Sequence, residues 1–388
     1  MRLLLIQPST KLVQDLGTWP ADTASAAALP PPPAPGSFYW LSCERTELER
    51  QLPAVQSLLQ QLCGTPLLDL HISDLLNAQI PSTFDYTSDY DVMLFRRLEG
   101  AAPPPPPAPT ARSWRHQTPA PAPTNLQNLD TAPVGFAVFD PLLFSVHPAD
   151  CPVRAQHLQR LLTPSTAPEK RSTANSRLPA SSADLMLRQL DLMVDGFLSL
   201  RRDMARQMEQ WQMALLNPNS RFHDWSKVLQ AQLGLHQLNE ICEDQRAAVQ
   251  DWIDALESWP EENETAERRA RELLRVRSRD VLEHIERVSH HVHRMEQSAE
   301  AALQMHFSAQ SNRANDIMRT LTTLTAIFLP LNLIAAVFGM NFDVLPLVHA
   351  EDGFWWAMGA MALIGAALLV FFLRRRYIER DSLLGENT

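Results

Sequence analysis

The stretch that decides the fold is residues 320–342, TLTTLTAIFLPLNLIAAVFGMNF, a run of 23 residues without a charge. A second uncharged run, GFWWAMGAMALIGAALLVFFL, covers the 21 residues of 353–373. A membrane-spanning helix needs about 20 apolar residues, and core helices of soluble proteins seldom reach this length without a charge. The sequence therefore predicts two C-terminal transmembrane helices, and a pair of buried core helices is the alternative.

The charges around these runs predict their orientation, because cytosolic flanks carry the excess of Lys and Arg. Cations precede the first run (Arg313 and Arg319) and follow the second as a basic ring (Arg374, Arg375 and Arg376). The link 343–352 has no Lys or Arg and contains three acids, Asp343, Glu351 and Asp352. We therefore expect a multi-pass protein of the cell (inner) membrane, with an extracytoplasmic link and both termini, including the tail 374–388, in the cytosol.

The composition and the cysteine positions exclude further classes of function and site. The chain has 388 residues and a net charge of −10, which argues against a nucleic-acid partner because such proteins present a basic face. Its four cysteines form no CxxC pair, so neither a cysteine zinc site nor a disulfide framework is expected. The apolar start of residues 1–8 is too short for a signal peptide and is typical of a first strand.

Residues 1–163 predict a cytosolic α/β domain. Apolar runs at 134–139 and 142–147 flank Asp140-Pro141 and predict a hairpin. Further expected elements are a strand at 91–98, a helix at 47–62 with Pro53 as an alternative start, and a short helix starting at Ser73. Two proline-rich segments, 29–36 and 100–124, predict loops of polyproline character.

Residues 164–183 are rich in Ser, Thr, Ala and Pro and predict a linker before a helical stalk region, 184–319. Three amphipathic runs are expected, at 185–216, at 221–258 and from 265 onward. The third contains no Pro or Gly before Pro330, so it enters the first membrane run without a break. A helix over 265–338 would be about 110 Å long and needs other helices to cover its apolar face.

One face of the membrane-entering helix is mixed and carries most of its small and polar residues, at spacings of three and four, whereas the opposite face is apolar and bulky. This polar face consists of Asn315, Met318, Thr322, Thr325, Leu329, Asn332 and Ala336. Polar atoms within a membrane are costly unless they meet protein or water. The face thus predicts either a helix–helix contact or a water-filled pore lined by several copies of the chain.

The outer end of this helix carries Gly339-Met340-Asn341, followed by a short loop and one last span. This context, with Asn312, Arg313, Met318 and the Phe328–Leu331 stretch, resembles the CorA family of divalent-cation channels and its GMN motif. The resemblance implies an α+β cytosolic domain, a long helical stalk and two transmembrane helices in a CorA-like homopentameric funnel. It further implies Mg²⁺ import, with Co²⁺ or Ni²⁺ as other substrates, a ring of Asn341 at the mouth, and a conduit that includes Leu321 beside the polar face.

The resemblance also implies gating by cytosolic Mg²⁺, with the stalk carboxylate at Asp280. The insert 100–124 obscures the alignment of its partner on the cytosolic domain, for which Asp89 and Asp91 are only nearby candidates. A solvated Asp280 paired with Arg277 is the alternative. The loop departs from the family, since Leu345-Pro346-Leu347-Val348 replaces the usual Met-Pro-Glu-Leu stretch. A zinc transporter of the ZntB type is the alternative within the superfamily, although His284, His290, His291 and His293 form no complete zinc site by helical spacing. A membrane-anchored sensor without a pore is a different class. We expect no enzyme, because no nucleophile–base set or phosphate-binding glycine loop is present.

Overall fold

The computed structural model describes residues 1–20, 32–99, 130–162, 178–216, 225–259, 265–340 and 352–374. The chain divides into two compact units, Met1–Glu300 and Ala301–Thr388. The predicted break at 217–220 and the proline-rich segment 100–124 lie outside the described residues.

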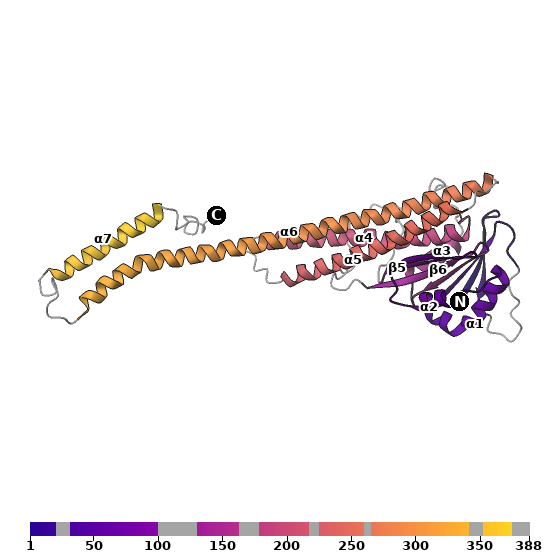
Figure 1. Ribbon diagram of the computed structural model, residues 1–388, viewed down its shortest axis with the longest axis horizontal. Coiled ribbons are helices and arrows are strands. Elements are labelled where there is room, and N and C mark those ends of the chain that lie inside the picture. Colours follow the sequence, from indigo (N-terminus) through magenta and orange to yellow (C-terminus); the bar gives the residue numbers. More distant parts are fainter. Residues whose placement is uncertain are drawn as a thin grey trace, which may run out of the picture. The chain divides into compact units, whose positions relative to one another are not determined.

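The first unit is built on a seven-stranded mixed sheet with the order β2-β1-β3-β7-β6-β5-β4. Only β3 and β7 run parallel, and all other neighbours are antiparallel. The strands are β1 (Arg2–Gln7), β2 (Leu12–Thr18), β3 (Phe38–Glu44), β4 (Thr83–Tyr86), β5 (Asp91–Leu98), β6 (Thr131–Val138) and β7 (Leu142–His147) (Figure 1). The predicted first strand, the strand at 91–98 and the 134–147 hairpin are thereby confirmed.

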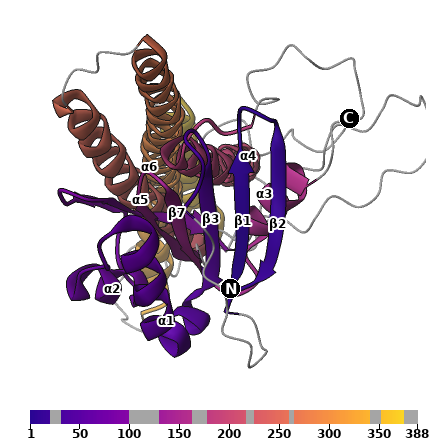
Figure 2. The same ribbon diagram turned by 90° about the vertical axis from the view of Figure 1, so that its right-hand side faces the viewer.

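Both faces of the sheet are covered, and the side-chain period of two sorts the residues between two cores. On β3, Phe38 and Trp40 enter one core, while Tyr39 and Leu41 enter the other. Helices α1 and α2 cover the second of these faces, and α3 and α4 lie over the other (Figure 2). Because β3 is buried on both faces, its sequence FYWLSC is apolar apart from Ser42 and shows no alternation, which is why the sequence did not reveal it.

Helix α1 (Arg45–Cys63) confirms the helix at 47–62 but is kinked at Gln51, two residues before Pro53. Proline removes a backbone donor and its ring crowds the carbonyl four residues earlier, so it starts the second segment of the helix. Helix α2 (Asp69–Leu76) begins four residues before the expected start at Ser73, which was wrong. Its Leu75 packs so closely on β6 that a Cβ on Gly135 would lie 2.2 Å from Leu75 Cδ2.

The helical part of this unit begins with α3 (Pro152–Leu162), which was not predicted, and continues with α4 (Ser182–Leu216), α5 (Trp225–Ser258) and α6 (Thr265–Phe338). Helix α6 has the predicted bounds and runs on into the second unit. Helix α5 is anchored on both sides. Trp252 Nε1 donates to Ser278 Oγ of α6 at 2.9 Å, and Gln245 Nε2 donates to the Arg96 carbonyl of β5 at 2.8 Å.

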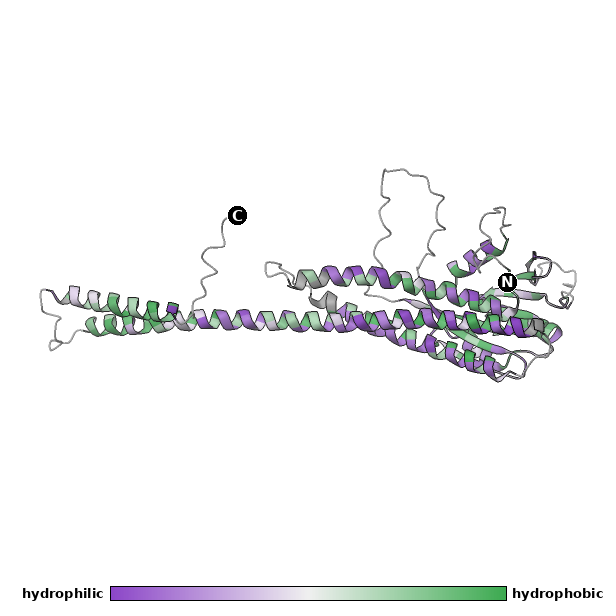
Figure 3. Cartoon of the chain, turned by 90° about the horizontal axis from the view of Figure 1, so that it is seen from above, coloured by the Kyte–Doolittle hydropathy of each residue, from purple (hydrophilic) through white to green (hydrophobic). Residues whose placement is uncertain are grey.

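The second unit contains the end of α6 and α7 (Gly353–Arg374), which matches the predicted second span. Both helices are long and apolar enough to cross a membrane (Figure 3). None of the apolar window of α7 is buried, and only 6% of that of α6 is. Trp355 and Trp356 are each 71% exposed. These helices are therefore not core helices of the chain, and the buried-helix alternative is excluded for the single chain.

Candidate cation pathway and stalk carboxylate site

The predicted polar face of α6 is exposed along the second unit. Its bulky members Met318 and Leu329 are open, 67% and 68% exposed, and Leu321 beside the face is 62% exposed. The remaining members, Asn315, Thr322, Thr325, Asn332 and Ala336, are exposed as well. The face is thus available to other copies of the chain or to water.

The opposite face of α6 packs against α7. Thr323 is 3% exposed, and Ile327, Leu331 and Ile334 are partly buried. Gly365 of α7 lies beside Leu331, since a Cβ at this position would be in ordinary van der Waals contact with Leu331 Cδ1 at 3.7 Å. Helix α7 therefore covers only part of the apolar side of α6, since Leu324 and Phe328 are each still 52% exposed, and it leaves the Asn and Thr side uncovered.

The threonine hydroxyls of α6 already have acceptors within the helix. Thr322 Oγ1 donates to the Met318 carbonyl at 2.7 Å, and Thr325 Oγ1 donates to the Leu321 carbonyl at 2.8 Å. Such back-bonding uses the hydroxyl proton and leaves the oxygen lone pairs facing outward. These side chains consequently present acceptors, the atoms that the water shell of a cation would bind.

Helix α6 ends at the start of the GMN motif. The Gly339 N–H reaches the carbonyl of Ala335 at 2.9 Å, and the Met340 N–H reaches that of Val337 at 3.3 Å. A Cβ on Gly339 would lie 3.2 Å from the Ala335 oxygen, so the residue suits a tight helix end. Asn341 lies outside the described residues, so its place at the mouth stays a prediction.

The charged ends of the spans are described only in part. The Asp352 carbonyl accepts the Trp356 N–H at 3.1 Å at the start of α7, and Arg374 is the last residue of α7. Asp343 and Glu351 of the loop, and Arg375 and Arg376 of the basic ring, lie outside the described residues.

A carboxylate cluster forms in the first unit around Asp280, the residue predicted for the regulatory site. Asp191 of α4, Asp280 and His284 each offer a ligand atom, and these atoms lie within 4.8 Å of one another. His284 is central: its Nδ1 is 3.3 Å from Asp191 Oδ1, and its Nε2 is 3.8 Å from Asp280 Oδ1. The donor set of two carboxylates and one imidazole can hold a divalent cation.

Charge crowding favours a cation at this cluster. Burial raises the pKa of Asp191, and the nearby carboxylates of Asp195 and Asp280 raise it further, against a lowering by His284. A bound cation would relieve that repulsion. The cluster borders a cavity of about 710 Å³, and the side chain of Asp280 is 62% exposed, so solvent ions reach it.

The structure does not show the pair of Asp280 with Arg277 that the alternative interpretation expected. Arg277 Nη1 lies 3.0 Å from Asp184 Oδ1, and Arg188 reaches the other oxygen of Asp184 at 3.3 Å. Among the ion pairs of the described ranges, Asp280 has His284 as its partner and not Arg277. Asp89 accepts from Ser88 Oγ at 3.0 Å and does not belong to the cluster.

Sequence reasoning missed Asp191 and Asp184. Both lie in an amphipathic run in which acids at helical spacing are ordinary, and only the packing of α4 on α6 brings them to their partners. His284 had been noticed as a histidine of the stalk, but spacing along α6 alone could not show that its neighbour is a carboxylate on another helix.

The comparisons with known proteins agree with this architecture. The family model described as CorA-like Mg²⁺ transporter protein matches residues 119–376. The chain is 29% identical over 100 residues to the cobalt/magnesium transport protein CorA of Thermotoga maritima, covering 26% of this chain and 28% of the relative. It is 28% identical over 101 residues to the magnesium transport protein CorA of Haemophilus influenzae, covering 26% and 32%. The alignments thus span about a third or less of these relatives.

Solved structures extend the likeness in fold to the whole chain. The structure of the CorA magnesium transporter from Methanocaldococcus jannaschii matches with a TM-score of 0.65 and 16% identity, covering 97% of this chain and 99% of that one. The full-length CmaX protein matches with a TM-score of 0.52 and 15% identity, covering 97% of each chain. The chain thus carries two candidate membrane spans after a mixed α/β unit. The chain belongs to the CorA-like Mg²⁺ transporter family, as its family-model match shows.

Proposed function

We propose that the chain is a divalent-cation channel of the cell membrane that imports Mg²⁺, with Co²⁺ or Ni²⁺ as further substrates. The observation that carries this proposal is the exposed Asn and Thr face of α6, opposite to the face that packs on α7. One chain cannot enclose a pore, so several copies must bring this face together. Family membership supports five copies, with both termini in the cytosol.

The chemistry of the pathway suits a hydrated ion. Mg²⁺ gives up its waters reluctantly and prefers oxygen ligands. Amide and hydroxyl oxygens can accept hydrogen bonds from its water shell, whereas conduction needs sites weak enough to release the ion. Between Asp316 and Asp343 the sequence has no carboxylate. The side-chain ligands of the proposed conduit are therefore only amide and hydroxyl oxygens, which bind a cation weakly enough to release it. Asn341 would form the outermost ring, and Leu329 and the Met318–Leu321 level would form the constrictions.

Gating would use the cluster of Asp191, Asp280 and His284. The carboxylates of Asp191 and Asp280, from α4 and α6, would supply oxygen ligands for cytosolic Mg²⁺, and an acid of a neighbouring copy, near Asp89 or Asp91, would add another. The bound ion would hold adjacent copies together and keep the pore closed. When cytosolic Mg²⁺ falls, like charges on the cluster repel and the stalks separate.

Flux through purified protein in liposomes tests the proposal. Influx of Mg²⁺, Co²⁺, Ni²⁺ and Zn²⁺ is measured side by side, with and without a pH gradient. We expect Asn341→Ala to lose most Mg²⁺ influx while the oligomer persists in detergent. The control is Thr320→Ala, which lies outside the polar face of α6. Zinc influx without magnesium influx would favour a zinc transporter, and no influx of any ion would favour a sensor without a pore.

A further inference from the structure

The cavity of about 710 Å³ in the first unit is lined by α3, α4 and α6, and its volume suits a small organic molecule. The carboxylates of Asp191 and Asp280 form only part of its lining. Apolar side chains form another part, and two of them are open to solvent, with Leu273 39% and Val276 62% exposed. The cavity therefore offers an aliphatic surface as well as charges.

His157 of α3 is the first sign of a ligand. Its ring lines the cavity and is only 6% exposed, yet neither nitrogen has a hydrogen-bond partner among the described residues. Buried polar atoms are normally hydrogen-bonded, because an unpartnered one has lost water without a replacement. Burial, helped by Arg188 and Arg160, lowers the pKa of His157 to about 3. The ring is therefore neutral, and one of its nitrogens carries a proton to donate.

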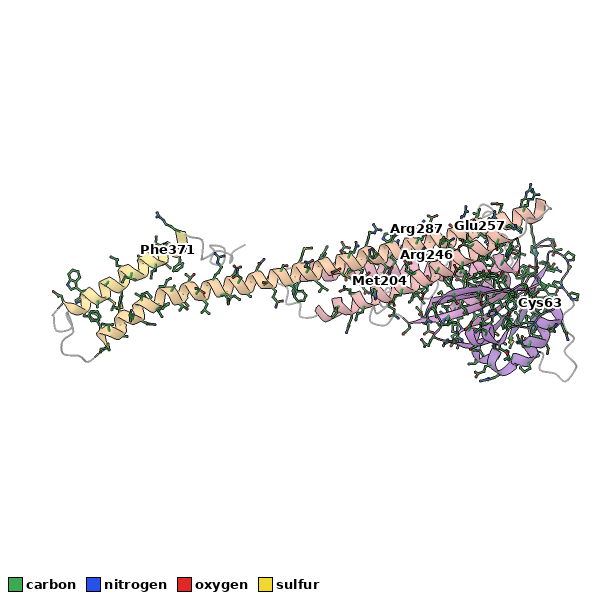
Figure 4. The ribbon with its side chains drawn as sticks, in the orientation of Figure 1. Cys63, Met204, Arg246, Glu257, Arg287 and Phe371 are labelled. Carbon is green, nitrogen blue, oxygen red and sulfur yellow. The ribbon has the colours of Figure 1, made fainter. Side chains whose placement is uncertain are left out.

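Most charges around the cavity already have partners within the chain. The ion pairs are Arg188 and Arg277 with Asp184, Arg279 with Glu257, and Glu283 with Arg287 (Figure 4 labels Glu257 and Arg287). Arg160 of α3 and Asp195 of α4 also line the cavity and are exposed, and neither takes part in an ion pair within the described part of the chain. These two charges are thus available to a ligand.

The acids of the cavity lie together at one end. Helices α4 and α6 run in step here, because Asp184 meets Arg277 and, seven residues further along both helices, Asp191 meets His284. Asp280 follows Arg277 on α6, and its carboxylate lies within 4.8 Å of that of Asp191. The acidic end is therefore beyond the ion pairs of Asp184 along both helices.

His157 lies at the other end of the cavity. The cations that act on its ring are Arg188 of α4 and Arg160 of α3. On α4, Asp191 and Asp195 come three and seven residues after Arg188, which at 1.5 Å per residue is an offset of about 5–10 Å. The cavity thus has hydrogen-bond donors at one end and carboxylates at the other.

We propose that this cavity binds an amino acid of elongated shape, with a carboxylate at one end and a cationic nitrogen at the other. The ligand carboxylate accepts hydrogen bonds from Arg160 and His157. The cationic nitrogen lies among the carboxylates of Asp191, Asp195 and Asp280. Both ends thereby form charge-assisted hydrogen bonds, which are stronger than neutral ones.

The length of the ligand follows from the offset between the two ends. An extended chain advances about 3.6 Å over the three bonds of a residue. An offset of about 5–10 Å therefore takes about four to eight bonds between carboxyl carbon and nitrogen. The ω-amino acid 6-aminohexanoate and the basic amino acid L-lysine both fall within this range. Their methylene groups pack on Leu273 and Val276, a surface that a metal ion leaves unused.

Binding of this ligand is separable from transport. Its nitrogen shares Asp191 and Asp280 with the Mg²⁺ site of the proposed function, so the two ligands compete. The test is calorimetry on the purified full-length protein in detergent, with EDTA to remove divalent cations. Because no metal and no flux enter this measurement, its failure leaves the proposed function standing.

The probes are 6-aminohexanoate and L-lysine, with hexylamine and hexanoate as matched compounds that each lack one charged end. We expect at least one of the two amino acids to bind at least about tenfold more tightly than hexylamine and hexanoate, because a hydrogen bond to a charged group contributes about that factor. Tighter binding of L-lysine assigns a basic amino acid, and tighter binding of 6-aminohexanoate assigns an ω-amino acid. Hexylamine that binds as tightly as both amino acids would overturn the proposal, since the carboxylate would then go unrecognised.

Two variants test the two ends of the cavity. Arg160→Gln and Asp195→Asn should each weaken binding of the tighter amino acid at least about tenfold. Arg206→Gln is the matched control, since Arg206 is a 74% exposed arginine of α4 outside the cavity lining. It should leave the affinity unchanged. All three side chains are exposed, so the variants are expected to fold. Equal affinity in the wild type and in the Arg160→Gln/Asp195→Asn double variant, or no binding of either amino acid, would overturn the proposal.

Discussion

Two buried histidines should make the first unit sensitive to acid. His157 of α3 is 6% exposed, its ring meets Trp40 edge-on at 5.8 Å, and neither ring nitrogen has a hydrogen-bond partner among the described residues. Burial lowers the pKa of His157 to about 3, helped by Arg188 and Arg160. Burial likewise lowers the pKa of His147 well below its usual value, helped by Arg154, Arg97 and His157.

The direction of the effect follows from proton linkage. Because the folded pKa lies below the unfolded one, near 6.5, the unfolded chain binds the proton first as the pH falls. Each histidine therefore contributes stability that is complete above about pH 6.5 and decreases toward the folded pKa. At pH 5.5 about ten of every eleven unfolded chains are protonated at His157, which costs about 1.4 kcal/mol.

Replacing His157 by phenylalanine removes this part of the pH dependence and also an unpartnered buried polar ring. The pH dependence of stability is measured by thermal unfolding of the full-length protein in detergent at pH 7.5 and 5.5, followed by tryptophan fluorescence. Acidification should lower the Tm of the wild type by about 3 °C more than that of His157→Phe, for a loss of about 1.4 kcal/mol.

Other titrating groups act in the opposite direction but cancel in the comparison. Burial raises the pKa of Asp91 to about 6, with Asp140 adding to the shift, and burial also raises the pKa of Asp191 and Asp244. These carboxyls take up protons in the folded state first, so acid stabilises the fold through them. They are unchanged in the variant. An equal Tm drop in both proteins would refute the reasoning, and His157→Leu serves as the second variant if phenylalanine does not fit.

Three further predictions concern the stalk cluster and the packing. Asp280→Lys should protect the stalk from protease at low Mg²⁺, because its ammonium replaces the charge of the bound ion; no Mg²⁺ effect on wild-type protection would contradict the gating proposal. Asp184→Asn should destabilise the protein by about 3–5 kcal/mol in thermal unfolding, because Arg188 and Arg277 then lack their buried carboxylate; the surface variant Asp203→Asn is the control. Gly135→Ala should cost about 1–3 kcal/mol through the 2.2 Å approach to Leu75, whereas Gly359→Ala, with no atom within 4 Å of its Cβ position, should be neutral; equal Tm values for the two would count against the packing described.

The sequence by itself determined the parts of the protein that depend on neighbours along the chain. The bounds of α6 followed from the absence of Pro and Gly between Thr265 and Pro330, and α7 followed from an uncharged run of spanning length. The exposed polar face of α6 also followed, because the spacing of Thr322, Thr325 and Leu329 fixes which residues share a side of a helix.

The tertiary structure alone decided what lies across from each residue. Strand β3 has no alternation because helices cover both of its faces. Helix α2 begins at Asp69 after Leu68, which makes no side-chain cap, so no capping residue marks this start in the sequence. Asp191 joins Asp280, Arg277 turns to Asp184, and His236 meets Glu296 only because α4, α5 and α6 pack together. Helical spacing specifies the neighbours of a residue on its own helix, whereas the partner on another helix depends on how their apolar stripes pack, which no local pattern encodes.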